Sequence, residues 1–271
     1  MKKTNEEMEN KKKEKVIIAT STLYRADNET DKIRAKLALE MIKKAKKEGY
    51  EIIVVDAGSP KKIRNEFEKA GAIVIPDRSE TMGASRREAF REAFNRGAEI
   101  IIWMEPEKHD YIRNIEKSIK PIMENKAEMV IPNRKSFNSY PKAQQYIEPF
   151  ANLFWKELTK ADLDMWFGVR IFKRSLAHYF LEYRGEYGDK WDSLFIPIIN
   201  ALADGRKIES VKIDYVHDNR QTKNEEHSLD FYKKRIDQLN LLMITCENHW
   251  QRVFSKVKNP IASYGASDEI N

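Results

Sequence analysis

Two glutamates separated by one proline, Glu105-Pro106-Glu107, stand directly after an apolar run. That run, Ile100 to Met104, has the residue types of a buried strand. Pro106 has no N–H to donate to a sheet, so we expect the strand to end there. Both carboxylates would then lie at the carboxyl end of a strand, where open α/β sheets bind ligands. Two such oxygen ligands suit Mg²⁺ or Mn²⁺ bound to a diphosphate; the alternative is that they only solvate a turn.

Two further polar loops follow predicted strands, at Thr20–Arg25 and at Asp56–Pro60. In a doubly wound sheet these loops and the acidic turn meet at one crevice. Asp56 can accept hydrogen bonds from a base or ribose, and Gly58 lets the backbone approach a ligand closely. The alternative is that Asp56 caps the next helix and Gly58 only serves the turn.

The elements that must position these loops alternate between strand and helix. We expect strands at Val16–Thr20, Ile52–Val55, Ala72–Ile75, Ile100–Met104, Met129–Pro132, Phe167–Phe172 and Ile208–Val216. We expect helices at Asp31–Glu48, Ile63–Ala70, Gly83–Asn95, Ile147–Leu158, Asp192–Ala203 and Leu229–Val257. Four strand–helix repeats in succession predict a mostly parallel sheet with helices on both faces. The last strand alternates apolar and polar residues, as a half-exposed strand does, and an antiparallel direction is one option for it.

Composition limits the partners and the compartment. The chain has 271 residues, a hydrophobic fraction of 41% and a formal charge of +6. A positive surface suits nucleic acid, an anionic membrane or a phosphorylated ligand; we favour the ligand, and expect no nucleic acid, because no aromatic-and-basic motif appears. No apolar run is long enough to span a membrane, and the charged N-terminus lacks the centre of a signal peptide. We therefore expect a cytoplasmic protein, and its single cysteine excludes an internal disulfide.

The domain organisation predicted from these patterns has three parts. Residues 1–14 form a charged mobile tail, residues 15–225 form the α/β domain, and residues 226–271 form a C-terminal helical extension. The long amphipathic helix of the extension either packs back on the domain or forms a homodimer contact.

Three segments resemble inverting family-2 and related glycosyltransferases of the GT-A fold. They are Val55-Asp56-Ala57-Gly58-Ser59, Gly83-Ala84-Ser85-Arg86 and Glu105-Pro106-Glu107, and the resemblance covers roughly residues 15 to 220. It implies a Rossmann-like, mostly parallel GT-A sheet with an acceptor-side part in the second half. It also implies an enzyme that moves a sugar from a nucleotide-diphosphate sugar to the hydroxyl of a small-molecule, glycan or lipid acceptor, assisted by Mg²⁺ or Mn²⁺.

The resemblance assigns roles to individual residues on the donor side. The nucleotide-sugar would be bound by Thr20, Ser21, Tyr24, Asp56, Gly58, Ser59, Arg86 and Lys108. The metal would be held by Glu105 and Glu107, together with His217, which falls where retaining relatives place a histidine ligand. The family uses aspartates at the acidic motif, so the longer glutamates would grip a metal differently. Lys108 is the next residue after Glu107; its ammonium group could contact a phosphate, or its charge could partly replace that of the metal.

On the acceptor side, Asp189 and Asp192 lie in a segment that resembles the one supplying the catalytic base of inverting members. Asp189 is the first choice for the base, since Asp192 is also well placed to cap the following helix. Trp166 could stack on a sugar or belong to the core. The acceptor would be bound by Arg134, Tyr140, Gln144, Trp166 and Arg170.

Three functions remain open on the sequence. The first is the glycosyltransferase, whose stereochemistry is undecided because His217 favours retention and Asp189 favours inversion. The second is a nucleotidyltransferase, which usually needs a glycine-rich loop after the first strand; here the loop 21–25 has no glycine. The third is a non-catalytic GT-A-like module for binding or assembly, in which the Glu-Pro-Glu motif no longer binds metal efficiently.

Overall fold

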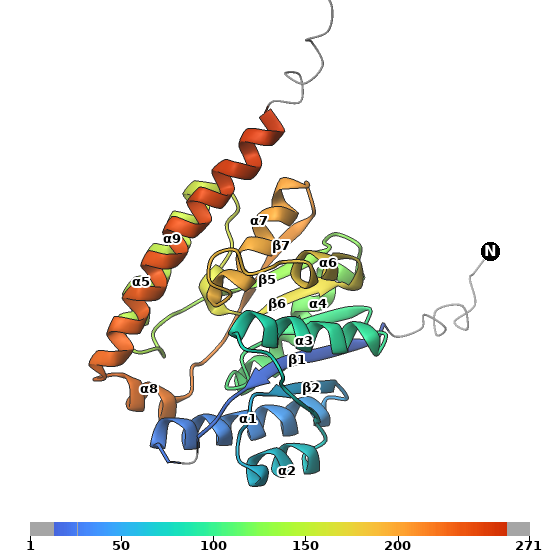
Figure 1. The fold of residues 1–271 in the computed structure, drawn as a ribbon, viewed down its shortest axis with the longest axis vertical. Coiled ribbons are helices and arrows are strands. Elements are labelled where there is room, and N and C mark those ends of the chain that lie inside the picture. Colours follow the sequence, from blue (N-terminus) through green and yellow to red (C-terminus); the bar gives the residue numbers. More distant parts are fainter. Residues whose placement is uncertain (1–13, 26, 259–271) are drawn as a thin grey trace, which may run out of the picture.

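The computed structural model describes residues 14–25 and 27–258. Their core is a seven-stranded sheet (Figure 1). The strands are β1 (Val16–Thr22), β2 (Glu51–Asp56), β3 (Ile73–Pro76), β4 (Ile100–Trp103), β5 (Met129–Arg134), β6 (Arg170–Lys173) and β7 (Ile208–Ile213). Their order is β3-β2-β1-β4-β6-β5-β7. Only β6 runs against its neighbours, because it pairs antiparallel with both β4 and β5 while the other pairs are parallel.

Helices cover both faces of this sheet, as the alternating pattern predicts. They are α1 (Glu29–Lys47), α2 (Lys61–Lys69), α3 (Met82–Asn95), α4 (Ile115–Met123), α5 (Lys142–Thr159), α6 (Ala177–Leu181), α7 (Ile196–Ala203), α8 (Asn219–Glu225) and α9 (Leu229–Lys258). Neighbouring strand residues face opposite cores: Ile17 lies in the cluster that α3, α7 and α9 cover, and Ile18 in the cluster that α1 covers. The continuous apolar strands therefore reflect burial on both sides.

Polar side chains fix the beginnings of the two helices that border the crevice. The Asn28 side chain accepts a hydrogen bond from the Asp31 N–H at the start of α1, and Thr81 accepts one from Ala84 at the start of α3. Each cap satisfies an N–H group that has no partner within the helix. The caps set where α1 and α3 begin beside the loops that follow β1 and β3.

Three details of the second half differ from the expectations. The strand β7 pairs parallel with β5, so the antiparallel option is wrong. The segment Met165–Phe167 is a 3-10 helix, and β6 begins only at Arg170, because Gly168 adopts a φ of 85° that breaks the extended run. The helix predicted from Asp192 begins at Ile196, after a separate 3-10 turn.

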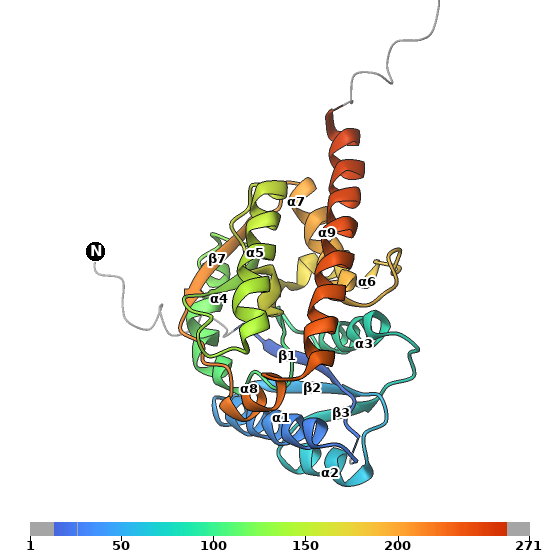
Figure 2. The ribbon, with the colours of Figure 1, turned by 90° about the vertical axis from the view of Figure 1, so that its left-hand side faces the viewer.

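The predicted C-terminal helix is present as α9 and packs back along α5 and α7. Figure 2 shows α5 and α9 side by side, with the end of α9 extending past the domain. The predicted tail 1–14 lies, except for residue 14, outside the described residues, as does the end of the chain from residue 259. None of the described helices is long and apolar enough to cross a membrane.

Candidate active site at the carboxyl ends of the strands

The acidic motif forms a tight turn at the end of β4. The Lys108 N–H donates a hydrogen bond to the Glu105 carbonyl at 3.1 Å, which closes a four-residue β-turn. Pro106 occupies the second position of this turn, which its fixed φ favours. The strand therefore ends where the sequence predicts, and both glutamates lie beyond it.

A cleft of about 530 Å³ opens beside this turn, at the carboxyl ends of β1 to β4. It is bordered by the loops after β1, β2 and β3, the start of α3 and one residue of α1. Its polar and charged lining comes from Ser21, Thr22, Tyr24, Arg34, Asp77, Ser79, Glu80, Thr81, Ser85, Arg86, Glu105 and Glu107. A larger cavity of about 720 Å³ lies at the other end of β4, beside Glu99 and Lys173, away from these loops. The converging polar groups make the smaller cleft the candidate site.

Glu105 is positioned from two sides. Its Oε2 lies 3.4 Å from Nζ of Lys108. Its carboxylate also lies directly against Gly168, where a Cβ would collide with it. Burial alone would lower the pKa of Lys108, but the charges of Glu105, Tyr140 and Glu148 together outweigh burial, and the lysine pKa is raised. Lys108 is therefore an ammonium ion at neutral pH.

Glu107 points to a different group of partners. The Tyr24 hydroxyl donates to its Oε1 at 3.1 Å. Burial raises the pKa of Glu107, and the positive charge of Arg34 opposes this rise only in part. Arg34 also pairs with Glu225 at 2.7 Å. The sequence did not single out Arg34, because it is one of many basic residues in α1 and only the fold turns it into the cleft.

His217 is buried and already has partners. Its Nδ1 lies 2.9 Å from the Thr222 hydroxyl, and its ring centroid lies 4.4 Å from that of Tyr140. Burial lowers its pKa to about 3, so the ring is neutral at pH 7. Within the described residues, His217 does not form a three-ligand group with Glu105 and Glu107. The three predicted metal ligands are therefore not assembled around one point in this structure.

The donor-side residues divide between the cleft and its supporting loops. Ser21, Tyr24 and Arg86 line the cleft. The remaining predicted donor residues lie outside its lining: Thr20, Asp56, Gly58, Ser59 and Lys108.

Asp56 holds two loops together. It accepts hydrogen bonds from the Thr22 hydroxyl at 2.7 Å and from the backbone N–H groups of Gly58 and Ser59. The Ser59 hydroxyl in turn accepts from the Tyr24 N–H at 2.9 Å. Asp56 does not cap α2, whose N-cap position is Pro60. The alternative in which Asp56 caps the next helix is therefore wrong, whereas Gly58, with a φ of 111°, does serve the turn.

Arg86 is a buried cation at the wall of the cleft. Its Nη1 donates to the Lys190 carbonyl at 2.5 Å and to the Ser193 hydroxyl at 2.8 Å. Burial lowers its pKa to about 10, which leaves it charged at neutral pH. Its guanidinium also lies 5.5 Å from the ring centroid of Trp103. These contacts tie the 190–193 segment to α3 and fix the cation beside the cleft.

The two aspartates predicted near the acceptor are both held by the protein itself. Asp189 forms a double hydrogen bond with Arg87, at 2.6 and 2.8 Å, and also accepts from the Thr81 hydroxyl. Asp192 accepts from the Tyr183 hydroxyl at 2.5 Å and from the Lys190 N–H at 2.6 Å. It lies in the 3-10 turn Trp191–Leu194 and does not cap α7, so that interpretation is wrong.

The five predicted acceptor residues contact other parts of the protein, and four of them are buried. Arg134 pairs with Asp164 at 2.7 Å and with Glu148 at 2.6 Å, and Gln144 donates to Glu148. Arg170 donates to backbone carbonyls, among them that of Met165 at 2.7 Å. The other two members pack on aromatic rings: Tyr140 on those of Phe137, Tyr215 and His217, and Trp166 on that of Phe195. The cleft lining includes none of the five predicted acceptor residues.

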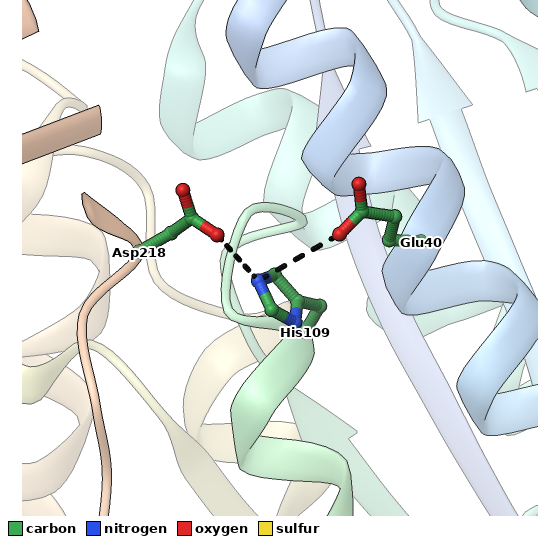
Figure 3. A group of neighbouring side chains, drawn as sticks. All are labelled: Glu40, His109 and Asp218. Atoms are coloured by element: carbon green, nitrogen blue, oxygen red, sulfur yellow. Dashed lines mark hydrogen bonds and ion pairs between the residues drawn. The ribbon is translucent and has the colours of Figure 1, made fainter. Parts of the chain in front are cut away.

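One group of three metal-type ligands does occur elsewhere in the described residues, at Glu40, His109 and Asp218. Figure 3 shows both carboxylates directed at Nε2 of His109, at 3.0 Å from Asp218 and 3.9 Å from Glu40. Arg220 also pairs with both carboxylates, at 2.8 and 2.9 Å, and Lys44 contacts the other imidazole nitrogen. The group is therefore an ion-pair network that fastens α8 to α1.

Comparisons with known proteins bear on the family and the fold of the chain. The family model described as glycosyl transferase family 2 matches residues 28–180. Three similar solved structures are of glucosyl-3-phosphoglycerate synthase from Mycobacterium tuberculosis. The first is 13% identical, covers 86% of this chain and 81% of that chain, and has a TM-score of 0.61.

The second structure holds Mn²⁺, UDP-glucose and phosphoglyceric acid; it is 14% identical, covers 86% and 80% of the two chains, and has a TM-score of 0.62. The third holds Mn²⁺, UDP-glucose and glycerol 3-phosphate; it is 13% identical, covers 86% and 80%, and has a TM-score of 0.61. No curated protein sequence matches the chain. The structural likeness confirms the predicted GT-A type of sheet.

Proposed function

Because the chain belongs to glycosyl transferase family 2, we propose that it transfers a sugar from a nucleoside diphosphate sugar to an acceptor hydroxyl. One observation carries this proposal: Arg34 of α1, Arg86 of α3 and the two glutamates of the turn after β4 line a single cleft at the carboxyl ends of β1 to β4. Open α/β sheets bind nucleotides at this edge. The similar structures solved with UDP-glucose support the choice of donor.

The cleft offers suitable groups for each part of such a donor. Arg34 and Arg86 are cations that can neutralise a diphosphate, and both line the cleft. Tyr24 and Leu23, beside Ala57, provide an aromatic and apolar wall for a base or ribose. Cleavage of the sugar–phosphate bond leaves a diphosphate with additional negative charge, which fixed cations stabilise as it develops.

We assign the divalent ion, Mg²⁺ or Mn²⁺, to Glu105 and Glu107. Both are oxygen donors that line the cleft, and oxygen is the ligand type that these ions prefer. The third predicted ligand, His217, does not lie with the two glutamates, and a cation lies beside each carboxylate. We therefore expect the bound donor to provide further ligands to the ion. When bound, such an ion would supply Lewis-acid stabilisation of the leaving diphosphate.

For the acceptor we propose a small phosphorylated compound with a free hydroxyl group. Support comes from the similar structures, which were solved with phosphoglyceric acid and with glycerol 3-phosphate. A glycan or lipid acceptor is the alternative, and hexose is the sugar class to test first. Asp189 stays a proposed base, although its hydrogen bonds to Arg87 favour a structural role.

The deciding experiment measures donor binding and transfer with a panel of nucleotide sugars, with and without Mn²⁺ and Mg²⁺. The wild type should bind at least one donor, and Arg34→Ala should weaken that binding about tenfold through the lost charge contact, roughly 1.4 kcal/mol. Lys135→Ala is a matched control, because Lys135 pairs with Asp214 at the surface. Absence of binding to every nucleotide sugar would overturn the proposal.

A second candidate function is a non-catalytic binding or assembly module. It is favoured by the engagement of Glu105 with Lys108 and by the failure of the three predicted metal ligands to converge. Nucleotide-sugar binding without transfer to any acceptor, and without hydrolysis, would select this candidate over the enzyme.

We also propose that a second copy of the chain covers the outer face of α5 and α9. Six of the ten large apolar side chains that are exposed in the described part of the chain lie on these two helices: Tyr146, Phe150, Leu153, Leu229, Ile236 and Ile244. The three on α5 are spaced by four and three residues, which places them on one face. Apolar patches of this kind are typical of contacts between proteins.

A further inference from the structure

The turn at the end of β4 places a lysine beside the first carboxylate of the acidic motif. Glu105 and Lys108 are the first and last residues of one β-turn, joined by the Lys108 N–H to Glu105 carbonyl hydrogen bond. The ends of a β-turn lie within about 7 Å of each other. The ion pair of 3.4 Å between their side chains is therefore a direct product of the Glu-Pro-Glu-Lys sequence.

Aromatic rings hold the ammonium group in this place. Nζ of Lys108 lies 4.8 Å from the ring centroid of Phe167 and 5.6 Å from that of Tyr215. Only 13% of the lysine side chain is exposed. A cation over aromatic faces is stabilised by the ring quadrupoles. The two rings therefore stabilise the ammonium group at this position, where the lysine side chain has little contact with bulk water.

The backbone at Gly168 limits the positions that the Glu105 carboxylate can take. Gly168 packs directly against Glu105, and a Cβ there would overlap the carboxylate. The Glu105 side chain borders the cleft and is 40% exposed. An ion that enters the cleft and binds Glu105 must therefore compete with the ammonium group for this carboxylate.

We propose that the ammonium group of Lys108 and a divalent ion are alternative partners of Glu105. Lys108 is then a tethered cation at the metal position, and the divalent ion binds by displacing it. The proposal rests on the assignment of the metal to Glu105 made above. Two consequences follow: the wild type binds divalent ions weakly, and it retains affinity for a diphosphate when no divalent ion is present.

The test is a Mn²⁺ titration of the full chain without nucleotide, with free Mn²⁺ measured by electron paramagnetic resonance. Lys108→Met keeps the length and apolar contacts of the side chain but removes its charge, so Mn²⁺ should bind at least tenfold more tightly. Lys108→Arg keeps the charge and should bind Mn²⁺ as weakly as the wild type. Lys135→Met is the matched control, since its ion pair with Asp214 lies outside the cleft.

The double variant Glu105→Gln with Lys108→Met separates this explanation from a general gain of negative charge. It should lose the tightening that Lys108→Met produces. Unchanged Mn²⁺ affinity in Lys108→Met, or the same tightening in Lys135→Met, would overturn the proposal. Circular dichroism of each variant establishes that it is folded before titration.

A second measurement uses UDP in the presence of EDTA. The wild type should bind UDP, and Lys108→Met should bind it at least tenfold more weakly until Mn²⁺ is restored. The two proposals fail in different ways. If the variants show the expected Mn²⁺ affinities but no protein binds any nucleotide, the tethered cation stands and the transferase does not. If UDP binds but the Mn²⁺ affinity is the same with and without the Lys108 charge, the transferase stands and the tethered cation does not.

Discussion

At the scale of single residues, the candidate site owes its character to the partners of its charged groups. Glu105 is paired by Lys108, Glu107 by Tyr24, and Asp189 by Arg87. A sequence pattern shows these acidic side chains but not the partners that they contact in the fold. The motif 105–107 was predictable because proline ends a strand locally. The pairing of Asp189 was not, because Arg87 is 102 residues away.

Glu107 is expected to matter for binding more than for stability. Its raised pKa means that the ionised form is less favourable in the folded chain than in the unfolded one. Above that pKa, Glu107→Gln should leave the free energy of unfolding equal to or higher than that of the wild type. It should also weaken metal-dependent donor binding at least tenfold. Urea melts at pH 8 and calorimetry with a nucleoside diphosphate measure the two effects.

Glu157→Gln serves as the control, because Glu157 lies at the surface of α5 and pairs only with Lys160 among the described residues. Equal donor affinities in the Glu107 variant and the wild type would remove Glu107 from the site.

Asp189 is expected to contribute stability that depends on pH. Hydrogen bonds from Arg87 lower its pKa, so its contribution is complete above the unfolded pKa of about 3.9 and is lost as the pH falls through the folded value. Asp189→Asn should cost about 1–3 kcal/mol at pH 7, the usual value for a hydrogen bond to a charged group. The difference from the wild type should shrink when urea melts are repeated at pH 3.

A variant that folds as stably as the wild type but has no transferase activity would instead support Asp189 as the base. Such a result would contradict the structural role that its contacts favour.

At the scale of elements, local signals predicted the first half of the fold better than the second. The strands β1 to β4 are continuous apolar runs bounded by polar loops, so periodicity alone found them. The direction of β6 and β7 depends on pairings between segments far apart in the chain, which periodicity does not record. The helix α4 contains Pro121, a residue that usually interrupts helices, and was not predicted.

The cap of α1 gives a prediction at this scale. Asn28→Ala removes the side chain that accepts the Asp31 N–H at 2.7 Å. The free energy of unfolding should fall by about 1 kcal/mol, the typical cost of losing an N-cap, as measured by thermal or urea melts. Donor affinity should stay within about twofold, because Arg34 lies well inside the helix. Asn28→Ser, which can still cap, should restore most of the stability.

At the scale of the whole molecule, the cleft lies at the carboxyl ends of β1 to β4. The helices α5 and α9, which lie side by side (Figure 2), carry six exposed large apolar side chains. The sequence predicted a dimer contact through the C-terminal helix as one of two options. The structure confirms that α9 packs back on the domain, and the dimer stays a prediction. It was not predictable that α5 shares the exposed face, because that requires the two helices to be placed side by side.

Phe150→Asp tests the outer face. A charge at the centre of a buried apolar contact is costly, so the dissociation constant of a dimer should rise at least tenfold. Light scattering after size-exclusion chromatography over a range of concentrations measures it. Met123→Asp, an equivalent change on α4, is the control. A wild type that is monomeric at every concentration would refute the dimer.

The reversed direction of β6 has a consequence for how such enzymes diversify. A strand that opposes its neighbours enters the sheet where they leave it, so Arg170 lies beside Trp103 and Gly168 reaches Glu105. The segment between β5 and β6 leaves the sheet after Arg134 and returns to it at Arg170. Evolution can lengthen, shorten or exchange that segment, and so change what lies beside the acidic turn, without rebuilding the strands β1 to β4 whose carboxyl ends border the cleft.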